Sequence, residues 1–142
     1  MKLHFYLIVS FLALITNMAN ASNWQLLGTT DSGEKAIEVD LDSISNSNGL
    51  RKVWTSTEYK KPQRSAKSAG ESFRSTRMLY YFDCQAKAAG VSQKIDYELP
   101  NGGGRVIYTV SQPVNSLELT DIAPDSVAEG ISRWACLTDQ QK

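Results

Sequence analysis

The chain has 142 residues, and its 15 basic and 15 acidic side chains give a formal net charge of zero. Such a balance offers no electrostatic reason to bind nucleic acid. The only histidine is His4, which lies inside the export leader predicted below, so the mature chain would have none. The lack of histidine argues against Ser-His-Asp and Cys-His catalysis and against most zinc and copper sites, and we predict neither a metal site nor a cofactor.

Residues 1–21 have the three zones of a cleavable secretory signal. Lys2 supplies the positive start, residues 5–15 form an almost unbroken apolar run, and small residues end at Ala21. This run is too short for a membrane anchor, which needs roughly 20 residues. We expect cleavage after Ala21, which leaves residues 22–142 as one exported domain in the periplasm, at the cell surface or in the medium. No later run is long enough to cross a membrane.

Six stretches of the mature chain have the composition of β-strands, with alternating apolar and polar residues or with β-branched and aromatic side chains. They cover residues 24–29, 37–42, 50–59, 73–84, 91–99 and 105–111. Turn-forming residues separate several of them, for example at 46–49 and 100–104. Connections this short predict antiparallel neighbours. Residues 60–70 hold no large apolar side chain and are predicted to form a loop.

The periodicity changes near the C-terminus. Val127, Ile131 and Trp134 are spaced as on one face of a helix, and Ser126 with Glu129 fits a capping box at its start. The resulting prediction is an α+β domain, in which an antiparallel β-sheet of about six strands carries one C-terminal helix packed on it.

The mature chain has two cysteines, Cys84 at the end of the fourth predicted strand and Cys136 at the end of the helix. In an oxidising compartment an even pair most often bonds to itself, so we predict one disulfide. It would tie the helix to the longest strand. The alternative is two buried free thiols.

Three carboxylates, Asp40, Asp42 and Glu58, could serve a hydrolase that works without histidine. Asp40 and Asp42 are two positions apart, which would place them on one strand face, and we interpret that face as solvated. The glycines at 102–104 lack the order of a phosphate-binding loop and indicate a flexible hairpin turn. We therefore predict that the protein is not an enzyme.

The predicted loop carries four positive charges that could meet an acidic partner, such as a sulfated sugar or an acidic protein surface. They are Lys60, Lys61, Arg64 and Lys67. The alternative interpretation is an ordinary solvated loop. The aromatic side chains also allow two interpretations, packing in the core or forming a binding face. Three of them are consecutive and cannot all point to the same side of a strand: Tyr80, Tyr81 and Phe82.

Several short motifs occur in a particular order along almost the whole mature chain. After a tryptophan-containing strand they are Val39-Asp40, Asp42-Ser43-Ile44, Val53-Trp54, Glu58-Tyr59, Phe73-Arg74-Ser75, Asp83-Cys84, Pro124-Asp125-Ser126 and Ala135-Cys136. In this order and spacing the chain resembles the bacterial surface-adhesin protein E family. The resemblance implies a six-stranded antiparallel sheet with a C-terminal helix and a cystine between strand and helix. It also implies a role in holding host matrix or serum proteins such as vitronectin, laminin or plasminogen at the cell surface.

The combined expectation is an exported, non-catalytic binding protein with a protein partner. The alternative is a periplasmic structural or envelope-assembly partner of unknown ligand.

Overall fold

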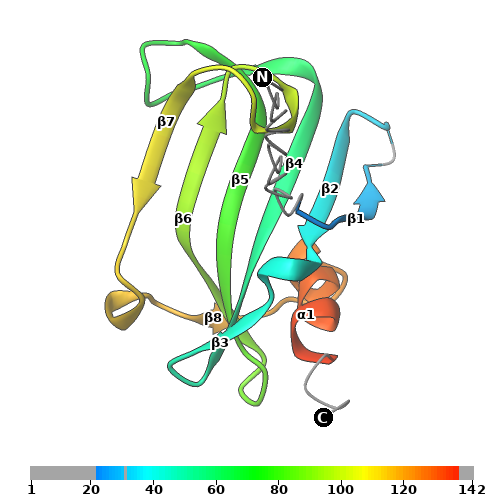
Figure 1. The fold of residues 1–142 in the computed structure, drawn as a ribbon, viewed down its shortest axis with the longest axis vertical. Coiled ribbons are helices and arrows are strands. Elements are labelled where there is room, and N and C mark those ends of the chain that lie inside the picture. The colour runs from blue at the N-terminus through cyan, green and yellow to red at the C-terminus, as the bar shows by residue number, and fades with distance from the viewer. Residues whose placement is uncertain (1–21, 31, 138–142) are drawn as a thin grey trace, which may run out of the picture.

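The computed structural model describes residues 22–30 and 32–137, which form an antiparallel sheet with one α-helix (Figure 1). The strands are β1 (Trp24–Thr29), β2 (Lys35–Asp40), β3 (Ser45–Ser47), β4 (Leu50–Arg64), β5 (Ser72–Asp83), β6 (Ala88–Tyr97), β7 (Val106–Ser111) and β8 (Thr120–Asp121). The α-helix is α1 (Val127–Leu137), and three 3-10 helices are η1 (Leu41–Ser43), η2 (Pro100–Gly102) and η3 (Val114–Ser116). The predicted leader, residues 1–21, lies outside the described residues.

The strand order is β1-β2-β4-β5-β6-β7, with β3 paired to β4 and β8 paired to β6. Every pairing is antiparallel, so the predicted fold class is confirmed, and each of the six predicted strands is present. Figure 1 shows α1 at the end of the sheet where β3 and β8 lie, while the β4–β5 connection lies at the opposite end. No helix among the described residues is long and apolar enough to cross a membrane.

The core forms where α1 lies on the sheet. Val39, Val53 and Phe82 come from β2, β4 and β5 and have no exposed surface, and they pack in one cluster with Ile131 and Ala135 of the helix. At about 25 cal/mol per Å² of apolar surface, the larger of these side chains, the valines, Phe82 and Ile131, each stabilise the fold by roughly 1.5–3 kcal/mol when fully buried. The helix is thereby fixed to one face of the sheet.

The helix begins as its sequence predicts. The Ser126 Oγ accepts the Glu129 N–H at 3.2 Å, and the Glu129 carboxylate accepts the Asp125 N–H at 2.9 Å. Two residues of the predicted apolar stripe are nevertheless exposed, Val127 by 45% and Trp134 by 39%. The sheet covers only the Ile131 side of the stripe.

The second predicted strand was wrong at its end. β2 stops at Asp40, and residues 41–43 form η1, because the Asp40 carboxylate accepts the Asp42 N–H at 3.2 Å and caps that turn. Asp40 is only 8% exposed, whereas Asp42 is exposed. The two carboxylates therefore do not share a solvated strand face.

The predicted loop at 60–70 was also wrong in its first half. β4 continues to Arg64, and only residues 66–70 form the turn. A bulge interrupts the pairing with β5, because Glu58 pairs with Ser75 and the next residue of β4 to pair is Gln63, opposite Phe73. The bulge lets the strand continue through residues that do not fit a regular ladder.

Candidate functional site

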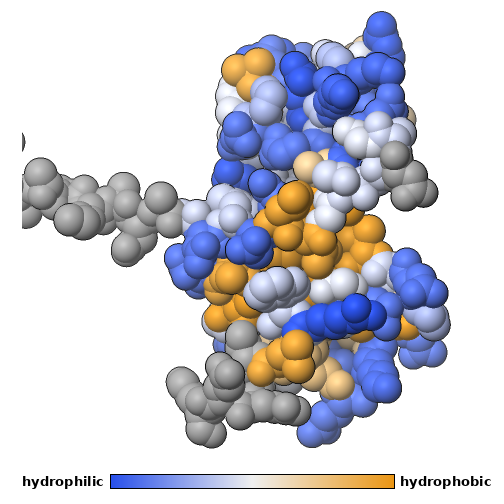
Figure 2. Space-filling view, turned by 90° about the vertical axis from the view of Figure 1, so that its right-hand side faces the viewer, coloured by the Kyte–Doolittle hydropathy of each residue, from blue (hydrophilic) through white to orange (hydrophobic). Residues whose placement is uncertain are grey.

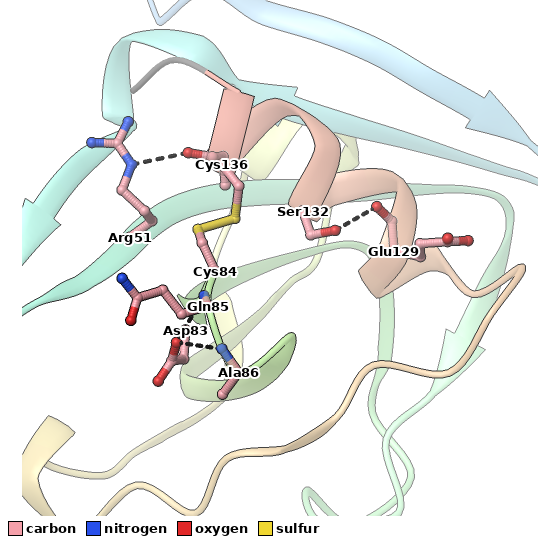
Figure 3. Close-up of a disulfide and its surroundings, with 9 residues drawn as sticks. Arg51, Asp83, Cys84, Gln85, Ala86, Glu129, Ser132 and Cys136 are labelled. Carbon is pink, nitrogen blue, oxygen red and sulfur yellow. Dashed lines mark hydrogen bonds between the residues drawn. A yellow bond between two sulfur atoms is a disulfide. The ribbon is translucent and has the colours of Figure 1, made fainter. Parts of the chain in front are cut away.

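The two cysteines anchor one end of the molecule. Cys84 directly follows β5, Cys136 lies in the last turn of α1, and the two are bonded, with 5.8 Å between their Cα atoms (Figure 3). The predicted disulfide is confirmed, and the described residues contain no free cysteine. The Arg51 Nε of β4 donates to the Ala135 carbonyl at 2.9 Å, which places a cation at the negative end of the helix dipole. The bond and the arginine together hold the C-terminal turn of α1 on the sheet.

The four predicted partner-binding cations lie at the other end of the sheet, on the β4–β5 hairpin. We call residues 60–71 the basic hairpin. It holds four cations and one carboxylate, Glu71, for a net charge of 4 − 1 = +3. Two backbone hydrogen bonds close it: the Ser65 N–H donates to the Glu71 carbonyl at 2.8 Å, and the Gly70 N–H donates to the Ser65 carbonyl at 3.2 Å. The Ser68 hydroxyl donates to the Ile107 carbonyl at 2.8 Å, so the hairpin is tied to β7.

The four cations differ in whether their side chains already have a partner within the protein. Lys61 forms an ion pair with Glu34 at 2.7 Å, which raises the pKa of the Lys61 ammonium and lowers the pKa of the Glu34 carboxyl through a hydrogen bond and charge attraction. Arg64 donates to the Gly70 carbonyl at 3.3 Å within its own hairpin. Lys60 and Lys67 are exposed, and neither has a side-chain hydrogen bond or ion pair with another described residue, while the charge of Lys60 also lowers the pKa of the Glu34 carboxyl from a longer distance. The structure thus separates two engaged cations from two available ones.

Sequence reasoning missed the residue that shapes the hairpin. The Arg74 Nη2 atom donates to the Lys60 carbonyl at 3.0 Å and to the Tyr59 carbonyl at 3.4 Å. These carbonyls belong to the bulged part of β4, where regular pairing with β5 is lost. Arg74 therefore supplies hydrogen bonds that the ladder does not. Nothing in the local sequence marks it for this role, because its partners come from a different strand.

A row of cations and aromatic rings crosses the sheet beside the basic hairpin. The Lys35 Nζ lies 5.8 Å from the centre of the Tyr59 ring, which meets the Phe73 ring edge-on at 5.6 Å. The Lys94 Nζ lies 5.4 Å from the Phe73 ring and 5.7 Å from the Tyr108 ring. Each such contact stabilises an exposed site by about 0.5–1 kcal/mol. The row links β2, β4, β5, β6 and β7 and so stabilises the part of the sheet from which the basic hairpin extends.

The three candidate hydrolase carboxylates have other roles in the structure. Asp40 caps η1, and Asp42 lies on that turn. Glu58 lies one strand away and uses both oxygens, since Oε1 accepts the Ser56 hydroxyl at 2.8 Å and Oε2 accepts the Asn101 N–H at 2.9 Å. The described residues contain no group of three or more side chains suited to hold a metal ion.

The glycine run lies in the β6–β7 connection, as predicted. Gly102 and Gly104 have φ values of +70° and +71°, which only glycine adopts easily. The Gly102 N–H donates to the Ser75 hydroxyl at 3.0 Å, and the same hydroxyl donates to the Leu99 carbonyl at 2.7 Å. The connection is therefore folded back onto the sheet.

Comparison with known proteins agrees with this fold. The sequence profile of a family described as Surface-adhesin protein E matches residues 24–137. A solved structure of Haemophilus influenzae protein E in a second crystal form aligns with a TM-score of 0.56 at 14% identity, over 74% of this chain and 83% of that one. Two further structures of protein E from the same organism align with TM-scores of 0.56, one at 13% identity over 80% and 84% of the two chains and one at 12% identity over 79% and 85%. At these identities the structures show a shared fold. A sequence search of curated proteins found no significant match.

Proposed function

The chain belongs to the surface-adhesin protein E family, and from this membership we propose that it is an exported, non-catalytic binding protein that holds a host matrix or serum protein through its basic hairpin. The partner would present an acidic surface. The observation that carries the proposal is the pair of available cations, Lys60 and Lys67, on a hairpin of net charge +3. Exposed cations of this kind attract an acidic partner and raise the rate of encounter.

The proposal includes export. A leader at 1–21 that is cut after Ala21 would deliver residues 22–142 to an oxidising compartment. Disulfides persist in such compartments and are rare in the cytosol, so the Cys84–Cys136 bond supports this part of the proposal. Isolating the protein from fractionated cells and sequencing its N-terminus tests it. A chain that still begins at Met1, or that stays in the cytosol, would contradict export.

Retention of the exported protein on immobilised vitronectin, laminin and plasminogen at physiological salt tests adhesion. For the best retained ligand, the double variant Lys60→Gln with Lys67→Gln should bind about three- to tenfold more weakly, chiefly through a slower on-rate. The matched control is Lys87→Gln with Arg133→Gln, which removes two exposed charges at the disulfide end of the molecule.

Two results would count against the basic hairpin. The first is no retention on any of the three ligands, which would end the adhesion proposal. The second is an equal loss of affinity in the hairpin variant and in the control, which would show that the effect comes from the net charge of the protein and not from the hairpin. A third variant, Lys61→Gln with Arg64→Gln, should lose less than the first because these two cations already have partners.

A second candidate function, an envelope-assembly partner, is favoured by a different surface. Figure 2 shows an apolar belt on the side of the molecule where β1 and α1 lie. On α1, Val127 and Trp134 are 45% and 39% exposed. Exposed apolar surface of this kind is typical of protein contacts. Cross-linking in intact cells without host ligand separates the two functions, because only this candidate predicts capture of an envelope protein.

A further inference from the structure

A groove on the sheet face opposite α1 has the composition of a ligand site. Val53 packs against the helix, so the alternation of β4 turns the next residue, Trp54, to the other face. The groove there has a volume of about 270 Å³. The side chains that give it its chemistry are Trp24, Asp40, Trp54, Arg77, Ile95 and Tyr97. They come from five strands that are brought together only by the folded sheet.

Arg77 is held at the centre of this groove by its neighbours. Its guanidinium carbon lies 5.3 Å from the centre of the Trp24 ring and 5.6 Å from the centre of the Tyr97 ring. Its Nη2 donates to the Asn101 carbonyl at 3.0 Å. A Cβ at Gly102 would lie 2.6 Å from the guanidinium carbon, so the β6–β7 connection packs directly against the arginine. These two ring contacts and the hydrogen bond place the guanidinium at the groove.

The positive charge of Arg77 is not used by a carboxylate. Among the described residues no acidic side chain forms an ion pair with it, and its Nε is buried without a hydrogen-bond partner. Glu58 lies on the same face of β4 but gives its two oxygens to Ser56 and Asn101. The groove therefore favours a ligand that brings a negative charge.

The rings and the volume restrict the ligand further. A cation would repel Arg77, which already occupies the space between two rings. A wholly apolar ligand would bury the guanidinium N–H groups without partners. A small inorganic anion would leave the faces of the rings unused. The volume lies just below the roughly 300 Å³ at which sites for drug-sized ligands begin, so it suits one ring-sized unit.

We propose that this groove binds a pyranose sugar that carries a carboxylate, the carboxylate pairing with Arg77 and the ring lying against Trp54. Planar guanidinium groups match carboxylates with two parallel hydrogen bonds. The Asp40 carboxylate, which lines the groove, accepts a hydrogen bond from a sugar hydroxyl. The site shares no residue with the basic hairpin and stands independently of adhesion.

Titration of the exported protein with glucuronic acid and with N-acetylneuraminic acid, followed by calorimetry and by tryptophan fluorescence, tests the proposal. At least one acidic sugar should bind saturably, and glucose should bind at least tenfold more weakly. Benzoate is the second comparison, because it carries the carboxylate without the sugar hydroxyls. Binding of benzoate as tight as that of the acidic sugars, or no saturable binding of either sugar, would overturn the proposal.

Variants then test the assigned contacts. Arg77→Gln should weaken binding of the acidic sugar at least tenfold, whereas the matched charge change Arg133→Gln on α1 should leave it unchanged. Because Arg77 also supports the β6–β7 connection, folding of its variant is checked by thermal unfolding. Trp54→Leu, at a half-buried position, gives a second measurement that does not depend on the arginine. Unchanged affinity in Trp54→Leu, or in a folded Arg77→Gln protein, would refute the assignment.

Discussion

Removal of the disulfide should lower the free energy of unfolding by about 4 kcal/mol. Cys84 and Cys136 are separated by 52 positions, and the bond keeps this loop closed in the unfolded chain. The standard loop-entropy relation, 2.1 + 1.5R ln n, gives about 14 cal/mol/K for a loop of this length, which is about 4 kcal/mol at 25 °C. A domain of ordinary stability, about 5–15 kcal/mol, would lose a large part of it.

The assay is urea unfolding of the wild type and of the double variant Cys84→Ser with Cys136→Ser, followed by circular dichroism. Wild-type protein kept in a reductant should reproduce the variant, which controls for the serine substitutions. Hydrogen exchange should show the amides of α1 opening more readily, while Ile131 and Ala135 still pack in the core. A loss below about 1 kcal/mol, or unchanged exchange in α1, would refute the view that the bond restrains the chain and fixes the helix.

Two further predictions concern single positions in the sheet. Gly90→Ala should destabilise the fold by about 1–3 kcal/mol, because the new Cβ would lie 2.8 Å from the Glu118 carbonyl oxygen. The control Gly28→Ala, whose Cβ would have no atom within 4 Å, should change the stability by no more than about 0.5 kcal/mol. Thermal unfolding of the two variants compares these effects. Burial and then the charge of Glu58 raise the pKa of the Glu38 carboxyl above its ordinary 4.5. Because this pKa is higher in the folded state than in the unfolded state, the ionised Glu38 side chain destabilises the fold near pH 7. Below about pH 4 the carboxyl is protonated in both states, and this effect on stability disappears. Glu38→Gln should therefore stabilise the protein at pH 7 in urea unfolding, and a gain that persisted at pH 3 would contradict the assigned cause.

The main elements of the fold could be predicted because their signals are local. β5 ends in a run of large apolar and aromatic residues from Met78 to Phe82, and α1 carries both a capping signal and a 3.6-residue apolar period. The disulfide followed from the number of cysteines and the expected compartment. Each of these inferences uses residues within one element or a simple count, and each agrees with the structure.

The parts that were missed depend on contacts between distant residues. The extension of β4 through Pro62 to Arg64 contradicts the low strand propensity of that stretch, and Arg74 of the neighbouring strand supplies the hydrogen bonds at the bulge. β8 consists of two residues that only pair because the chain returns along β6. The groove around Arg77 likewise could not be found, since Trp24 reaches it from the far strand of the sheet.

The placement of the disulfide and of the basic hairpin at opposite ends of the sheet makes stability and adhesion separable. The cystine, Arg51 and the helix core lie at one end, and the basic hairpin is closed at the other by its own hydrogen bonds and by Ser68. A protein without the disulfide should therefore retain the hairpin ligand with unchanged affinity at any temperature where it is still folded. The hairpin variant Lys60→Gln with Lys67→Gln should in turn unfold at the wild-type urea concentration, because surface charges of this kind change stability by about 0.5 kcal/mol or less. If the disulfide-free protein lost affinity while still fully folded, the two ends would be coupled and the hairpin would not be an independent binding element.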